Sequence, residues 1–274
     1  MQLVATVSQA TDLEAAASVL VTTAGMSAAE ARMRLAPEPP ALLARLPEDL
    51  AAGVVIALVQ AGLPALAIDE RVPSDADRFQ VRSFVFESAG ARLTARDGEV
   101  LTLPWEEVRL VLRGVRTERT TSEHTETATR LALGRAVLTG GLVMTKKTTS
   151  TVRGSEENSE QFVLVHGRAG QRVMLAENAL EFSGLGALLQ PARTANMGVL
   201  VQELWRRTPQ AFHDDRLVRL GRRTLPFVLG GETVARSGSA EVRRTGTRGS
   251  VDVLAEVLDR AVQAGILREA TAGR

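Results

Sequence analysis

The residue types that most often carry out chemistry are scarce in this chain. Its 274 residues include three histidines, two lysines and no cysteine. Without cysteine there is no thiolate nucleophile, no disulfide and no cysteine-ligated zinc. No serine lies in a Gly-x-Ser-x-Gly nucleophile elbow, and neither lysine follows a glycine as a Walker-type phosphate loop requires. We therefore expect a protein that is not an enzyme and has no cofactor. A site assembled from residues far apart in the sequence is the one enzymatic alternative left open.

The only cluster of potential metal ligands is the run His213-Asp214-Asp215. Three consecutive residues on a regular element cannot all face one point, so a metal would need a loop and further ligands from elsewhere. Salt bridges from these acids to Arg216 or Arg219 are the simpler interpretation. His166 ends an apolar run and is expected at the surface. The sequence thus predicts no metal site.

A small basic patch is formed by Lys146, Lys147 and Arg153. Lysine ammonium groups are compact point charges that suit a phosphate-bearing lipid or metabolite. Glu156 and Glu157 follow closely, and a solvated hairpin is the competing interpretation. We take the three basic residues as candidate anion-binding residues.

Charge argues against specific nucleic-acid binding. The formal net charge is only +1, whereas phosphate neutralisation needs a concentrated basic face. The stretch 222–249 contains several arginines but no interleaved aromatic residues for base stacking beyond Phe227. Weak, nonspecific electrostatic contact is the most that this stretch predicts.

The first 70 residues carry well-marked local elements. Alternation predicts a strand around residues 3–7, after which Thr11 and Asp12 both offer N-cap oxygens to a first helix and Ser27 caps a second. Glu30 completes a capping-box pattern with Ser27. Prolines then end the second helix, an extended segment covers 42–46, and a third helix begins at the acidic pair Glu48 and Asp49. A strand near 66–68 closes this predicted α/β module.

This order of elements resembles the C-terminal domain of the bacterial ribosomal stalk protein and the related fold of the protease adaptor that binds N-degrons. The resemblance is carried by Thr23-Ala24-Gly25-Met26-Ser27-Ala28-Ala29-Glu30-Ala31, by Leu46-Pro47-Glu48-Asp49 and by Gln60-Ala61-Gly62. The stalk domain recruits translation factors through lysines on its first two helices. Here only Arg32 and Arg34 stand in that stretch, so the resemblance implies the fold but not that function.

After a polar stretch at 71–78, the periodicity changes from helical to alternating. A turn at Asp97-Gly98 leads to the segment Leu103-Pro104-Trp105-Glu106-Glu107-Val108. This segment resembles the early hairpins of bacterial pleckstrin-homology-like domains. The resemblance extends to residue 208 and implies further strands at 137–145, 162–165 and 172–175, with a capping helix at 194–207. A β-sandwich or another partly open barrel is the alternative.

Two later stretches lack a pattern of apolar residues, and a third segment, a helix, has an apolar face whose neighbour the sequence does not identify. The polar stretches 116–130 and 148–160 are expected to be long hairpin loops or disordered tips. A final amphipathic helix, beginning at residue 250, places Leu254, Leu258 and Val262 on one face. This face packs either on the chain's own β module or on a partner, and we take these three residues as candidate partner-binding residues.

The predicted fold class is therefore α+β, with a small N-terminal α/β module followed by a mainly antiparallel, pleckstrin-homology-like β-barrel, a capping helix and a C-terminal amphipathic helix. The expected units are 1–70 for the first module, 71–78 for a linker, 79–221 for the β module, 222–249 for a flexible basic segment, and 250–274 for the C-terminal helix and tail. Length and an average content of apolar residues both favour two folded modules.

The predicted function is a non-enzymatic protein-interaction adaptor or scaffold. Its partners are proteins that the sequence does not identify, and a homodimer is one form of such association. The alternative is a module that senses a phosphate-bearing lipid or metabolite at the barrel mouth, which would also allow peripheral lipid contact. The absence of cysteine, of a basic leader and of a membrane-length apolar run predicts a cytoplasmic protein with no membrane span.

Overall fold

The computed structural model describes residues 1–131, 145–228, 233–237 and 240–267. Within these, side chains are described except at 122–131, 145–154, 233–237 and 240–244. The statements below concern this part of the chain.

The N-terminal module has the predicted order of elements. They are β1 (Gln2–Thr6), α1 (Leu13–Ala24), α2 (Ala28–Leu35), β2 (Ala41–Leu46), α3 (Glu48–Gln60) and β3 (Ala65–Asp69). The three strands form an antiparallel sheet in the order β2-β1-β3. Asp12 and Ser27 accept hydrogen bonds from the amides of Ala15 and Glu30, as capping residues do. Gly25 ends α1 with a left-handed φ of 69°.

The second part of the chain is built on one large mixed sheet. Its elements are η1 (Asp75–Asp77), β4 (Phe79–Phe86), β5 (Gly90–Ala95), β6 (Val100–Pro104), η2 (Trp105–Glu107), β7 (Val108–Leu131), β8 (Thr145–Gly167), β9 (Arg172–Ala176), η3 (Phe182–Leu188), α4 (Arg193–Arg207), β10 (Phe212–Asp214), α5 (Leu217–Leu220), β11 (Thr233–Ser237), β12 (Ala240–Gly246) and α6 (Arg248–Gln263). The strand order is β11-β12-β7-β8-β9-β4-β5-β6, and β10 pairs with β7.

The α+β class is correct, but the described strands do not close into a barrel. The sheet path ends at β11 on one side and β6 on the other. Strand β4 joins β9 in parallel, and β10 joins β7 in parallel. The predicted strands at 162–165 and 172–175 and the helix at 194–207 are present as β8, β9 and α4. Of the predicted strand at 137–145, residues 137–144 lie outside the described part.

The polar stretches 116–130 and 148–160 are strands, and the prediction that they are loops was wrong. Strands β7 and β8 pair from Val108 and Gly167 out to Leu131 and Thr145. Threonine recurs along both strands, and its branched side chain favours the extended backbone. With polar residues on both faces, these strands lack the apolar alternation that marks a half-buried strand. The segment 222–249, expected to be flexible, contains the hairpin of β11 and β12.

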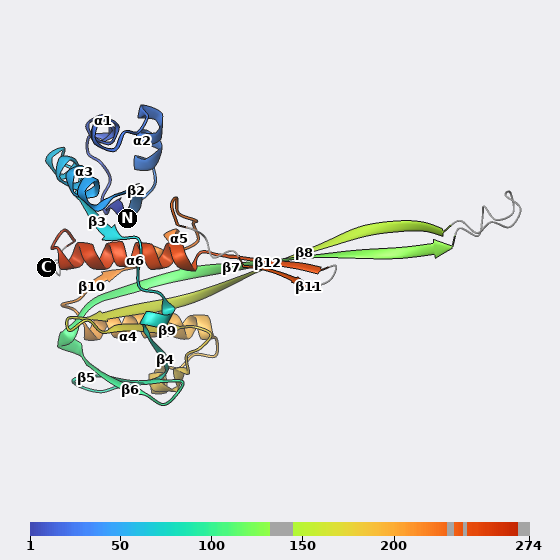
Figure 1. Ribbon diagram of the computed structural model, residues 1–274. Coiled ribbons are helices and arrows are strands. Elements are labelled where there is room, and N and C mark those ends of the chain that lie inside the picture. The colour runs from blue at the N-terminus through green and yellow to red at the C-terminus, as the bar shows by residue number, and fades with distance from the viewer. Residues whose placement is uncertain (132–144, 229–232, 238–239, 268–274) are drawn as a thin grey trace, which may run out of the picture.

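Helix α6 lies between the two sheets, so the layers share one central element (Figure 1). On one side, Val253, Val257 and Ala261 pack against one face of the N-terminal sheet, through Leu3, Ala5, Val7, Leu42, Leu66 and Ile68. On the other side, Val251, Leu254 and Leu258 pack against β7, β8 and β9, through Leu110, Leu112, Phe162, Leu164, Met174 and Ala176. Helices α1 to α3 cover the far face of the first sheet, and α4 covers the far face of the second.

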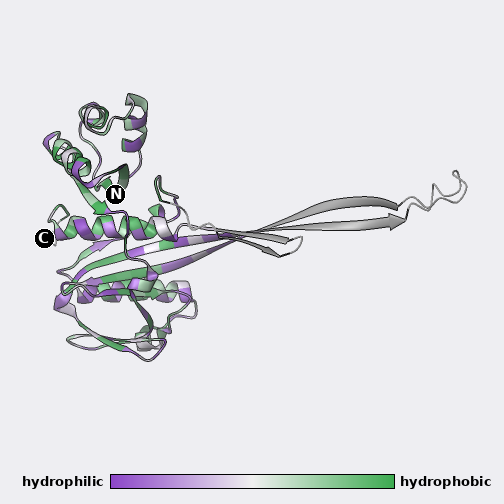
Figure 2. Ribbon diagram, in the orientation of Figure 1, coloured by the Kyte–Doolittle hydropathy of each residue, from purple (hydrophilic) through white to green (hydrophobic). Residues whose placement is uncertain are grey.

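Helix α6 is consequently buried on nearly all sides. Every residue from Ser250 to Asp259 is buried. Figure 2 shows that the helix nevertheless carries hydrophilic as well as hydrophobic residues along its length. Its polar residues must therefore find partners inside the protein.

Shortening Leu258 to alanine is expected to destabilise the protein by roughly 3 kcal/mol, because the side chain is fully buried and a cavity remains. The matched control is Leu50→Ala in α3, where the leucine is 50 % exposed and the same change removes little buried surface. Urea unfolding of the two variants measures the difference. Equal losses of stability would contradict the central position of α6.

Candidate functional site

A long two-stranded β-ribbon extends away from the body (Figure 1). We define the β-ribbon as residues 117–131 of β7 and 145–159 of β8, which pair one to one from Thr117 and Ser159 to Leu131 and Thr145. At about 3.4 Å per residue, its fifteen pairs span roughly 50 Å. Strand β12 pairs with the inner part of β7, from Glu118 to His124. Beyond His124, the two ribbon strands pair only with each other among the described strands.

The edge of β8 that faces away from β7 has no described partner strand along the ribbon. Strand β9 pairs with β8 only at residues 162–166. Gln161, just before that region, uses its carbonyl to accept from the amide of Glu177, so its backbone groups point away from β7. Backbone direction alternates along a strand, and the register is unbroken here. The amides of Ser159, Glu157 and Ser155 therefore point to the open edge.

Side chains contribute little to holding the inner ribbon together. The exposed pair of Arg119 and Glu157, 2.7 Å apart, links the two strands. Such exposed ion pairs contribute less than about 1 kcal/mol. An isolated two-stranded ribbon is only marginally stable in water. The direction of the ribbon must therefore be set where it joins the body.

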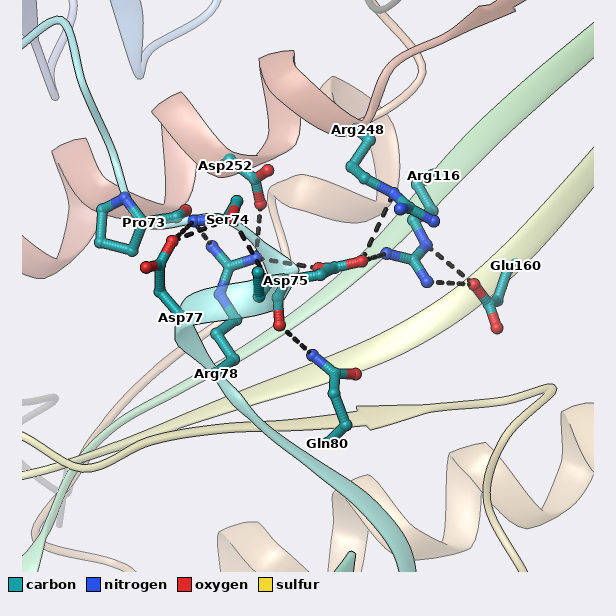
Figure 3. A network of polar contacts seen from close by, with 11 residues as sticks. Pro73, Ser74, Asp75, Asp77, Arg78, Gln80, Arg116, Glu160, Arg248 and Asp252 are labelled. Atoms are coloured by element: carbon teal, nitrogen blue, oxygen red, sulfur yellow. Dashed lines mark hydrogen bonds and ion pairs between the residues drawn. The ribbon is translucent and has the colours of Figure 1, made fainter. Parts of the chain in front are cut away.

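At that junction Asp75, Arg78, Arg116, Glu160, Arg248 and Asp252 form a charge network, buried or partly buried except for the exposed Arg248 at its rim, which we call the root network (Figure 3). The carboxylate of Asp75 accepts from Arg78 at 3.1 Å and from Arg116 at 2.6 Å, and it lies 3.4 Å from Arg248. Arg116 of β7 also contacts Glu160 of β8 at 2.6 Å. One carboxylate before β4 thus joins the ribbon strand β7 to the first residue of α6.

The charges of this network respond to burial and to one another. Burial lowers the pKa of Arg116, but the charges of Asp75 and Glu160 raise it by more, so the net pKa is above its ordinary value. Asp252 behaves differently: burial raises its pKa, and the opposing effect of Arg78 only partly offsets this. Asp252 and Arg78 lie 2.5 Å apart. Its neighbours therefore favour the charged form of Arg116, whereas burial disfavours the charged form of Asp252.

Asp252 is also the first of three buried acids on one stripe of α6. Asp252, Glu256 and Asp259 are four and three residues apart, so they lie on one face of the helix. They meet arginines from three different segments. Asp252 contacts Arg78 before β4, Glu256 lies 3.3 Å from Arg172 of β9, and Asp259 lies 2.5 Å from Arg109 of β7. We call these residues the acidic stripe and its arginine partners.

A β-bulge positions Arg109 for its contact with Asp259. The pairing of β7 with β8 shifts between Val108 and Leu110, so Arg109 is the extra residue of the bulge. Burial raises the pKa of Asp259, but His166 and Arg109 together lower it by more, so the net pKa is below its ordinary value. His166, predicted at the surface, is buried with its Nδ1 3.2 Å from Asp259.

This cluster does not resemble a catalytic triad. A triad needs a nucleophile beside the histidine and access for substrate. The histidine and the aspartate are both buried beneath α6, and they are 3 % and 1 % exposed. Their arrangement fits the anchoring of a helix to a sheet.

The residues His213, Asp214 and Asp215, for which no metal site was predicted, make other contacts. His213 stacks on Trp205 and lies 3.1 Å from the hydroxyl of Thr208. Asp214 pairs with Arg216 at 2.6 Å, as the simpler interpretation predicted. Within the described residues, no group of three or more histidine, cysteine or acidic residues is placed to hold a metal ion.

The candidate partner-binding residues are turned toward this chain itself. Leu254 and Leu258 are buried against β7, β8 and β9, and Val262 packs against the same cluster. The prediction of a free partner surface at these residues was therefore wrong, because α6 uses that face to join its own sheet. The outcome agrees with the alternative in which the helix packs on its own chain.

The candidate anion-binding residues belong to the outer and middle β-ribbon. Lys146 and Lys147 are paired with Arg130 and Thr129, and Arg153 with Glu123. Their side chains lie outside the described part of the structure. No barrel mouth surrounds them, because the described sheet is open.

Sequence reasoning missed the acidic stripe and the ribbon edge. The spacing of Asp252, Glu256 and Asp259 was a usable signal, since it marks one helix face. Their arginine partners lie far apart in the sequence, and no sequence signal indicated them.

No described helix has the length and apolar character needed to cross a membrane. No family model, curated protein or solved structure matches this chain.

Asp259→Asn is expected to cost more stability at neutral pH than in acid. The pKa of Asp259 lies below its ordinary value of 3.8, so the carboxylate stabilises the fold above pH 3.8. That contribution is lost as the pH falls toward the lowered pKa. Breaking a buried ion pair from one side costs about 3 to 5 kcal/mol, and partial exposure of Arg109 makes this an upper bound. Urea unfolding near pH 7 and near pH 3 measures the change.

Asp252→Asn is the matched control, and its pH trend should have the opposite sign. The pKa of Asp252 is raised above its ordinary value of 3.8 in the folded protein. Its stabilising contribution is thus present below pH 3.8 and lost as the pH rises through the raised pKa. The cost of Asp252→Asn should shrink toward neutral pH. The same pH trend in both variants would refute the assignment.

Proposed function

We propose that this chain is a non-enzymatic adaptor that binds a partner protein along the open edge of β8 in the β-ribbon. The observation that carries the proposal is the run of outward-facing amides at Ser155, Glu157 and Ser159, which has no described partner strand. An unpaired edge is a template for another strand. Proteins that bind by strand addition take their affinity from such main-chain hydrogen bonds.

The form of the ribbon supports this proposal. A two-stranded ribbon that extends from the body buries few side chains in a core and so gains little stability from packing. Its presence therefore favours a role in binding a partner. The described ribbon residues at the open edge, such as Ser155 and Ser159, are exposed and polar. Polar edge residues limit unspecific aggregation while leaving the backbone free to pair.

The root network supports it as well. Arg116 and Glu160 fix the two ribbon strands to each other, and Asp75 ties Arg116 to the linker. A binding element held in a fixed direction loses less entropy on association than one that must be ordered first. The arrangement therefore suits recognition by a ribbon that is oriented in advance.

The alternative is a sensor of a phosphate-bearing ligand, and the barrel mouth expected as its binding site is absent from the described sheet. It relied on a barrel mouth around Lys146, Lys147 and Arg153, and the described sheet forms no barrel. A second copy of the chain is one partner that the open edge of β8 would accept, since two such edges can pair antiparallel.

Ser155→Pro is expected to weaken partner binding by about tenfold or more, because proline removes an outward amide and its ring obstructs an added strand. Ser155→Ala is the matched control and should bind normally, because it alters the side chain and keeps the amide. Light scattering of the pure protein measures self-association, and capture from an extract of the source cells followed by titration measures a different partner.

Both variants should unfold at nearly the same urea concentration, because the replaced amide does not pair with β7. Equal binding by the proline and alanine variants would refute strand addition at this edge. Loss of binding in the alanine variant alone would point instead to recognition of side chains.

A further inference from the structure

A cleft of about 670 Å³ lies where the N-terminal module meets the segment after α5. One wall comes from the end of α2 and the turn into β2, and the other from α5 and residues 223–226, with α6 contributing to the lining. The cleft is distant in sequence from the β-ribbon and does not depend on the function proposed for it. Clefts of this size between modules are where small molecules most often bind.

The lining is mainly apolar. Its larger apolar side chains include those of Met33, Leu42, Leu220, Leu225 and Leu254, with prolines on both walls. Met33 is 66 % exposed, and a flexible methionine at a rim adapts readily to an apolar guest. The cleft thus offers a hydrocarbon-like surface to whatever enters it.

Two arginines introduce positive charge into this apolar lining. Arg223 lines the cleft with an exposed side chain, and no ion pair holds its guanidinium within the described part of the chain. Arg34 lines the opposite wall, and its Nε is buried without a hydrogen-bond partner. The acid nearest to Arg34 is Glu30, at 3.5 Å. Both guanidiniums therefore have unused donor capacity.

The only acid in the lining is already engaged. Glu38 lies 2.6 Å from Arg219, and the hydrogen bond from Arg219 is the main reason that the pKa of Glu38 is lowered, with smaller contributions from Arg223 and Arg216. The lining thus holds two arginines against one acid, and Glu30 pairs with Arg34 from outside it, which leaves Arg223 as the lining arginine without an ion-paired carboxylate in the described part of the chain. Charge complementarity calls for an anion.

A strained residue fixes one side of the cleft. Phe227, next to the lining residue Pro226, has a φ of 67°, which is rare for an aromatic residue. Arg34 lies over its ring at 4.3 Å. Strained backbone of this kind persists where surrounding contacts enforce it, and it gathers at binding sites. The stacking holds the Arg34 guanidinium in place across the cleft.

From these observations we infer that the cleft binds an amphipathic monocarboxylate, a molecule with a single carboxylate and an unbranched hydrocarbon tail. The tail lies along the leucine and proline wall, and the carboxylate accepts hydrogen bonds from Arg223 and Arg34. A cation with the same tail would face the guanidinium of Arg223, and a neutral alcohol would leave the Nε donor of Arg34 and the donors of Arg223 without a charged acceptor. The order of affinity is therefore anion first, then alcohol, then cation.

The test is titration calorimetry of the full chain with dodecanoate, dodecanol and dodecyltrimethylammonium, each below its critical micelle concentration. Dodecanoate should bind one to one and at least about tenfold more tightly than the cation, as expected for charge-assisted hydrogen bonds. No binding of dodecanoate, or equal affinity for the anion and the cation, would overturn the inference. This comparison uses the unaltered protein.

Variants then locate the site. Arg223→Gln should weaken dodecanoate binding by about tenfold, whereas Arg222→Gln, which changes an exposed neighbour outside the lining, should leave it unchanged. Thr224→Trp should abolish binding by filling the cleft from an exposed lining position. Thermal unfolding by circular dichroism confirms that each variant is folded. Dodecanoate binding that survives both Arg223→Gln and Thr224→Trp would place the ligand elsewhere and overturn the assignment.

Discussion

The acidic stripe of α6 is the constraint on which the rest of the structure depends. Burying Asp252, Glu256 and Asp259 costs several kcal/mol for each charge unless each finds a cation. Arginine partners come from the linker, from β9 and from β7, and Glu256 also pairs with Arg260 of α6 itself at 2.7 Å. Because Arg172 and Arg109 lie on strands of the sheet and Arg78 directly precedes β4, these pairs set both the rotation of α6 and its position along the strands. Apolar packing alone would tolerate neighbouring arrangements.

The same helix makes the two halves of the chain interdependent. Its Val253 and Val257 complete the core beneath the N-terminal sheet, and its Leu254 and Leu258 complete the core above β7, β8 and β9. An amphipathic helix has one apolar face and one wet face. Helix α6 has two apolar faces and, between them, a charged stripe that is neutralised inside the protein. A module boundary drawn at 71–78 therefore describes chain order better than it describes folding units.

Local signals explain which elements could be predicted from the sequence. In the N-terminal module, Asp12 and Ser27 lie at the starts of two helices and Gly25 lies at the end of the first. Because these signals are local in sequence, every element of this module was predicted. The β-ribbon was missed because threonine-rich strands with two wet faces lack the apolar alternation that identifies a strand. The surface position expected for His166 was wrong for a different reason. Its burial depends on α6, which begins more than eighty residues later and covers it only in the folded protein.

The β-ribbon and the central helix form one mechanical unit. Strand β12 pairs with β7 of the ribbon and passes directly into α6. At that passage the amide of Thr117 donates to the hydroxyl of Thr247, and the amide of Thr247 donates to the carbonyl of Thr117. The next residue, Arg248, reaches Asp75 of the root network. The position of α6, which buried charge pairs fix, therefore also sets the direction of the ribbon. A ribbon that is only marginally stable in water is in this way oriented by a helix whose residues Ser250 to Asp259 are all buried.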